Sequence, residues 1–131
     1  METQLPRSRS SNMKRPPKLS ILRSLLFTYC IENYDDPERE TFIVSKNIND
    51  EKELSELFDG LTKPEYLSYK PEERQWYIDT LNHFLDTSEN FESVFYLFDT
   101  YFDDEIADKR KFMTTLLKCL TRYQTELQEN K

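Results

Sequence analysis

The chain contains a single glycine, Gly60, among its 131 residues. Glycine is the residue that adopts positive φ at little cost, and β-hairpin turns, phosphate-binding loops and tight strand corners depend on it. A chain with one glycine is therefore not expected to form an all-β or a Rossmann-like fold. The sequence predicts an all-α protein instead.

Apolar residues recur at helical spacing along most of the chain after an N-terminal arm. Residues 1–15 lack this periodicity and are rich in Ser, Arg and Pro, so we expect a disordered basic arm there and a single helical domain over 16–131. Aromatic residues make up 14% of the chain, which predicts a core built largely from rings. We expect about six helices, over 17–33, 37–46, 51–59, 71–87, the stripe from 91 to 102, and the residues after 108, with one further turn near 64.

Local signals mark several helix ends. Asp36 followed by Pro37 predicts a helix start, although the β-branched residues 41–45 leave a strand open for this segment. Asp50 and Glu53 have the spacing of a capping box, and Gly60 lies where a left-handed residue ends a helix. A compact bundle is the expected architecture. A short helical-repeat array is the alternative, because helix starts at Pro37 and Pro71 lie 34 residues apart.

Charge is divided unequally along the chain. Residues 1–23 carry six cations against Glu2 alone, a net charge of +5, so the remaining 108 residues carry −12 of the total −7. An acidic body disfavours direct binding of nucleic acid, because affinity for phosphate needs cations. It favours a basic protein partner, and a solvated acidic surface is the plainer interpretation.

Four aromatic residues cluster around a proline-stiffened turn in the segment YLSYKPEERQWY, which covers residues 66–77. Tyrosine and tryptophan are enriched at protein interfaces because their rings are amphipathic. We therefore predict a partner-binding surface made by Tyr66, Tyr69, Trp76 and Tyr77. Packing of the same rings in the core is the competing interpretation, since one face of the 71–87 helix has to be buried.

The segment FESVFYLFD, residues 91–99, places Phe91, Phe95 and Phe98 ahead of Asp99, and Ile106 follows in the next loop. This arrangement resembles the entering helix and loop of an EF-hand, as in the calmodulin family. The resemblance is confined to this segment and its loop. It implies a module that grips an amphipathic target helix in an apolar groove.

The loop lacks the ligands that calcium requires. An EF-hand needs oxygen ligands at loop positions 1, 3, 5 and 12 and a glycine at position 6. Counting from Asp99, position 3 is Tyr101, position 6 is Asp104 and position 12 is Arg110, which brings a cation to the place of the bidentate glutamate. Any hand formed here is expected to be degenerate and free of metal.

The acidic turn after this segment is a second candidate for partner binding. Asp103, Asp104 and Glu105 precede a cationic run at residues 109–111. Both groups lie at helix ends where the macrodipole disfavours them, so mutual pairing is the simplest arrangement. If they do not pair, the three acidic residues are expected to bind a basic partner.

Catalytic chemistry is not expected. His83 is the only histidine, and Cys30 and Cys119 lie in apolar stripes, where thiol reactivity falls. No phosphate-binding loop, cofactor motif or metal-ligand cluster is present in the sequence. The longest apolar run, 19–31, contains Arg23 and is too short to span a bilayer. A cytoplasmic location is expected, and the basic arm leaves the nucleus open.

These features together predict a non-catalytic intracellular protein that binds a basic protein partner through an acidic and aromatic surface. Inhibitors, immunity proteins and regulatory subunits work in this way. The alternative is the metal-free EF-hand-like module described above. No cofactor is expected in either case.

Overall fold

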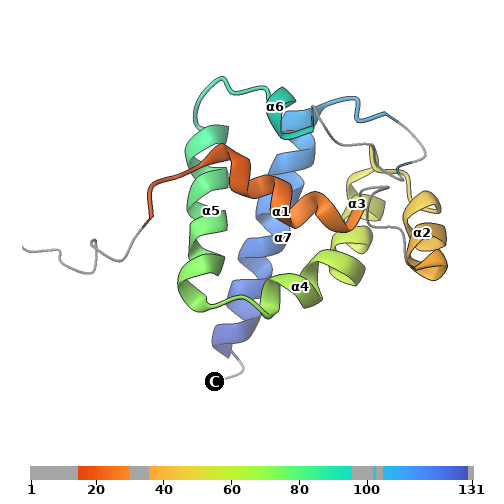
Figure 1. The fold of residues 1–131 in the computed structure, drawn as a ribbon, viewed down its shortest axis with the longest axis horizontal. Coiled ribbons are helices and arrows are strands. Elements are labelled where there is room, and N and C mark those ends of the chain that lie inside the picture. The colour runs from red at the N-terminus through yellow and green to blue at the C-terminus, as the bar shows by residue number, and fades with distance from the viewer. Residues whose placement is uncertain (1–14, 30–35, 96–101, 103–104, 130–131) are drawn as a thin grey trace, which may run out of the picture.

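The computed structural model describes residues 15–29, 36–95, 102 and 105–129 (Figure 1). The fold is all-α, as predicted, and the described residues contain no strand. When α3 and α4 are counted as one continuous helix, these residues form six helices packed together. Within the same ranges, no helix is both long enough and apolar enough to cross a bilayer.

The helical elements follow one another with short connections. The first is α1, Leu22–Leu26, flanked by 3₁₀ turns at Leu19–Ile21 and Phe27–Tyr29. It is followed by α2 (Pro37–Val44), α3 (Glu51–Leu57), a π-helical turn (Phe58–Thr62), α4 (Lys63–Leu67), α5 (Pro71–Leu85), α6 (Glu92–Phe95) and α7 (Lys109–Glu129).

The last helix, α7, is the centre of the bundle. It lies beside α5 and also contacts α3 and α4, which come from the middle of the chain (Figure 1). In a helical-repeat array each repeat would contact only its sequence neighbours. The packing around α7 is therefore that of the predicted compact bundle and not that of the alternative array.

The segment 37–46, for which helix and strand were both open, is helical. The Asp36 side chain accepts hydrogen bonds of 3.1 Å from the backbone N–H groups of Glu38 and Arg39, and Pro37 occupies the first turn. The cap and the proline outweigh the β-branched residues that follow. The predicted cap at Asp50 also forms, to Glu53 N at 3.0 Å, and Asp108 caps α7 in the same way, to Lys111 N at 3.0 Å.

The predicted left-handed helix end at Gly60 is wrong. No described glycine has a positive φ, and the helix continues through Gly60 as the π-helical turn into α4. The reason for a glycine is space. A Cβ atom at this position would lie 2.8 Å from Cε2 of the Phe42 ring, so Gly60 allows α2 to approach the α3–α4 helix.

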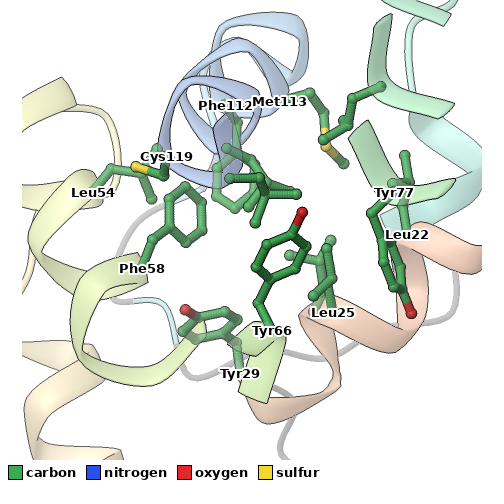
Figure 2. Packing of buried hydrophobic residues seen from close by; sticks show 14 of the residues in the cluster. Leu22, Leu25, Tyr29, Leu54, Phe58, Tyr66, Tyr77, Phe112, Met113 and Cys119 are labelled. Atoms are coloured by element: carbon green, nitrogen blue, oxygen red, sulfur yellow. The ribbon is translucent and has the colours of Figure 1, made fainter. Parts of the chain in front are cut away.

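Aromatic rings make up only part of the core, so the prediction of a core built largely from rings is wrong. Among the buried hydrophobic residues that the structure describes, seven are aromatic and fourteen are not. Phe112 on α7 is contacted by Phe58 and Phe95, each at 5.4 Å between ring centroids, and by Phe102 at 5.9 Å. Tyr66 is directed into the same interior (Figure 2). These three rings come from different parts of the chain, so their contacts with Phe112 connect distant segments to α7.

The predicted helices at 17–33 and 91–102 are described only in part. The first is found as the helical stretch from Leu19 to Tyr29, and residues 30–33 lie outside the described ranges. In the second, α6 covers Glu92–Phe95, while residues 96–101 lie outside those ranges. Phe91 is not part of the helix, because its φ is 61°. Its side chain is nevertheless fully buried.

Candidate functional site

The four aromatic residues of the 66–77 segment divide into two groups. Tyr66 and Tyr77 are buried, with 0% and 8% of their surface exposed, and Tyr69 is partly buried against the core. The rings of Tyr69 and Tyr77 stack at 5.4 Å, and Tyr66 meets both edge-on. With Tyr123 from α7, 6.1 Å from Tyr66, these three residues form what we call the tyrosine cluster.

Hydrogen bonds fix the hydroxyl groups of the tyrosine cluster. Tyr66 donates to the Arg74 carbonyl at 2.9 Å, Tyr69 to the Glu65 carboxylate at 2.5 Å and Tyr123 to the Asp59 carboxylate at 2.6 Å. Burial raises the pKa of each of these tyrosines above its usual value, and for Tyr69 and Tyr123 the bonded carboxylate raises it further. The cluster is structural. The prediction that Tyr66 and Tyr77 present their rings to a partner is corrected accordingly, because both rings are inside the fold.

Trp76 lies on the other side of α5 and is not part of the buried cluster of the core. Its indole Nε1–H donates to the carbonyl oxygen of Pro16 at 2.8 Å. The guanidinium carbon of Arg15 lies 4.6 Å from the ring centroid, a cation–π contact. Arg15, the last residue of the predicted N-terminal arm, and Pro16, which follows it, thus contact this tryptophan.

An exposed acidic residue, Glu72, lies one turn before Trp76 and is its neighbour on the helix surface. Asp79, one turn after Trp76, is partly buried, and its carboxylate accepts a hydrogen bond of 2.9 Å from the Gln75 side chain. Arg74, the cation of this helix, is engaged elsewhere, with the Tyr69 carbonyl and with Gln124 of α7. We call Glu72 and Trp76 the Trp76 surface. Its combination of an aromatic ring and a carboxylate suits a guanidinium or ammonium group.

The predicted acidic turn can be placed only in part. Asp103 and Asp104 lie outside the described residues. Glu105 is exposed, and its backbone carbonyl accepts a hydrogen bond of 3.0 Å from the Asn49 side chain. Whether the three carboxylates bind a partner stays a prediction.

Two of the three cations expected to pair with this turn have described partners elsewhere. Lys109 forms an ion pair with Glu92 at 3.3 Å. Arg110 donates to the carbonyl oxygens of Leu85, Thr87 and Glu89 at 2.7–2.9 Å, at and just beyond the end of α5. The last carbonyl groups of a helix have no hydrogen-bond donors within the helix, and Arg110 supplies donors here. This role was not predicted, because the bonded groups lie more than 20 residues away in sequence.

An open groove between α3 and α7, with a volume of about 690 Å³, was also not predicted. Two ion pairs cross it, from Arg122 to Asp59 at 2.5 Å and from Lys118 to Glu51 at 3.1 Å. Cys119, which lines it, is a free thiol with 3% exposure, and Cys30 lies outside the described residues. These ion pairs join α7 to α3 and to the π-helical turn after it, which is a structural role.

Within the described ranges, no group of three or more His, Cys, Asp or Glu side chains is placed to hold a metal ion. No protein-family model matches the sequence, and no curated protein or solved structure shows significant similarity to it. The functional argument therefore depends on the Trp76 surface itself.

Proposed function

We propose that this protein is a non-catalytic binding module that takes a basic segment of another protein on its Trp76 surface. One observation carries the proposal. The chain's own Arg15 and Pro16 occupy that surface, with the guanidinium over the ring and the Pro16 carbonyl bonded to the indole N–H. A partner that offers an arginine next to an accessible carbonyl would make the same two contacts.

The chemistry of the surface favours a protein partner. Tryptophan is among the residues most enriched at the energetic centres of interfaces. A cation over an aromatic ring is stabilised by the ring quadrupole, and Glu72 adds charge attraction. The body of the chain carries −12, which disfavours nucleic acid and favours approach of a basic protein. An intracellular setting is part of the proposal, and the free, buried thiol of Cys119 supports it.

We do not propose the EF-hand-like alternative, because no observation favours it. The loop position that would carry the bidentate glutamate is Arg110, and this side chain caps α5 through three carbonyl oxygens. Phe91, which the resemblance places in the entering helix, has a φ of 61° and precedes α6.

The test uses a synthetic peptide with the sequence of residues 12–20, because its Arg and Pro already fit the surface. Binding to the full chain is followed by the backbone amide resonances of α5, with a peptide in which Arg and Lys are replaced by Gln as the control. We expect the basic peptide to bind and the neutral one to bind at least several-fold more weakly, and Trp76→Ala to abolish the difference. Equal shifts with both peptides would contradict the proposal.

Ionic strength gives a second test. The Debye length falls from about 30 Å at 0.01 M salt to about 8 Å at physiological ionic strength, so association of a basic partner should slow as salt is added. Neutralising Asp103, Asp104 and Glu105 together should slow it further if these residues help to attract the partner. An association rate that does not change with salt concentration would exclude charge steering and would favour an apolar binding mode.

A further inference from the structure

We infer that residues 15–18 are a built-in ligand of the Trp76 surface, which a partner's basic segment must displace before it can bind. This inference rests on the proposed function and concerns the regulation of the same site. It assigns a role to Arg15, the last residue of the predicted disordered arm, and to the three residues that follow it.

Residues 15–18 contact α5 at two successive turns. Arg15 and Pro16 contact Trp76, and the backbone N–H of Lys18 points to Oγ1 of Thr80 at 3.4 Å. Trp76 and Thr80 are one helical turn apart, so the segment runs along the helix. Lys18 is in an extended conformation, and the adjacent prolines restrict the backbone before it. The segment is therefore laid on α5 as a bound peptide would be.

The contacts that hold residues 15–18 on α5 are few enough for the segment to dissociate. Residues 15–18 are all exposed, and they are joined to α5 by one cation–π contact and two hydrogen bonds of their backbone. The Lys18 carbonyl accepts a further bond, of 3.2 Å, from the backbone N–H of Ile21 next to α1. Anchoring begins directly afterwards, where Leu22 and Leu25 of α1 are fully buried. Because the anchor is separate from the contacts, the segment can leave Trp76 while α1 stays in the core.

A tethered ligand of this kind lowers the apparent affinity for any competitor. The apparent dissociation constant equals the intrinsic one divided by the fraction of molecules whose site is open. An exposed cation–π contact corresponds to about a two- to fivefold change in an equilibrium constant. Removing the Arg15 side chain should therefore raise the affinity for a competing peptide by about two- to fivefold, if the site is mostly closed.

The experiment titrates the peptide of residues 12–20 into three full-length chains: the natural sequence, Arg15→Ala and Lys18→Ala. The two variants change the net charge equally, but Lys18 contacts Thr80 through its backbone N–H, which Lys18→Ala keeps. The chain has one tryptophan, so a single indole N–H resonance reports the site directly. The amide resonances of α5 give a second readout.

We expect Arg15→Ala to shift the indole resonance in the free protein and to bind the peptide about two- to fivefold more tightly, while Lys18→Ala binds as the natural chain does. Equal gains in both variants would mean a simple charge effect and would overturn the inference. Equal binding by the natural chain and Arg15→Ala would also overturn it, while the proposed function would stand. If the peptide binds none of the chains better than its neutral control, the proposed function fails and the inference with it.

Discussion

Trp76 and Tyr77 are neighbours in sequence but belong to different regions of the molecule. Tyr77 is 8% exposed and stacks on Tyr69 inside the tyrosine cluster, whereas Trp76 is covered by the chain's own residues 15 and 16. Successive residues of an α-helix point about 100° apart, which is enough to put one ring in the core and the next outside it. Aromatic residues that are adjacent in a helical sequence can therefore belong to the core and to a binding surface, respectively.

The two regions also differ in what satisfies their polar atoms. The hydroxyl groups of the tyrosine cluster bond to groups of the bundle itself, such as the Arg74 carbonyl and the Asp59 carboxylate. The indole N–H of Trp76 bonds to Pro16, in a segment outside the bundle. Substitutions in the first region should thus cost stability, and substitutions in the second should mainly cost binding.

The largest expected effect is at Tyr66, which is fully buried at the centre of the tyrosine cluster. Tyr66→Ala should lower the free energy of unfolding by about 3–5 kcal/mol, because it leaves a cavity the size of an aromatic ring. Urea denaturation followed by circular dichroism measures this loss. Tyr66→Phe, the matched control, keeps the ring and loses the bond to the Arg74 carbonyl, so it should cost about 1 kcal/mol. Similar losses in both variants would show that the ring is not packed as described.

The next effect tests what holds α5 in the orientation that separates the two regions. Arg110→Ala removes the donors to three carbonyl oxygens at the end of α5 and should cost about 2–3 kcal/mol. Arg110→Lys should restore little of this, because an ammonium group lacks the planar fork that reaches several acceptors. Thermal and urea unfolding of both variants check the prediction. Full stability in Arg110→Lys would contradict the account of the cap.

Alkaline pH should act on the tyrosine cluster and its surroundings and spare the Trp76 surface. Burial raises the pKa of Tyr29 and of Tyr66 well above the usual value for tyrosine. Above pH of about 10 the unfolded state ionises while these residues keep their protons, so the folded state binds more protons and stability falls. Each such tyrosine contributes a slope of up to about 1.4 kcal/mol per pH unit.

The measurement is urea unfolding at several pH values between 8 and 12, where stability should be flat below about pH 10 and should decline above it. Tyr29→Phe and Tyr66→Phe should each make the decline less steep. An unchanged slope in both variants would show that these hydroxyls ionise as freely in the folded state as in the unfolded one.

Much of the fold could be predicted from the sequence because its signals are local. Asp36 with Pro37, Asp50 and Asp108 each mark a helix start through bonds to residues two or three positions away. The continuation of the helix through Gly60 was not predictable in the same way, since the space that this residue leaves is filled by Phe42 from another helix. Arg110 shows the same limit, because its acceptors lie on α5 and the turn after it.

The candidate site was predictable only as a set of rings. The sequence pattern did not separate Tyr66, Tyr69 and Tyr77 from Trp76. What separates them is the packing of α4 and α7 against the inner side of α5 and the seating of Arg15 and Pro16 on its outer side. Contacts between residues 60 positions apart leave no sign in either segment.

The smallest expected change in stability tests the central claim most directly. The claim is that Trp76 serves binding and not the core, so Trp76→Ala should lower the free energy of unfolding by only about 1 kcal/mol, from the lost cation–π contact and hydrogen bond. Urea unfolding of this variant, followed by circular dichroism, gives the value. A loss of about 3 kcal/mol or more, comparable to that of Tyr66→Ala, would show that Trp76 is a core residue and would contradict the account.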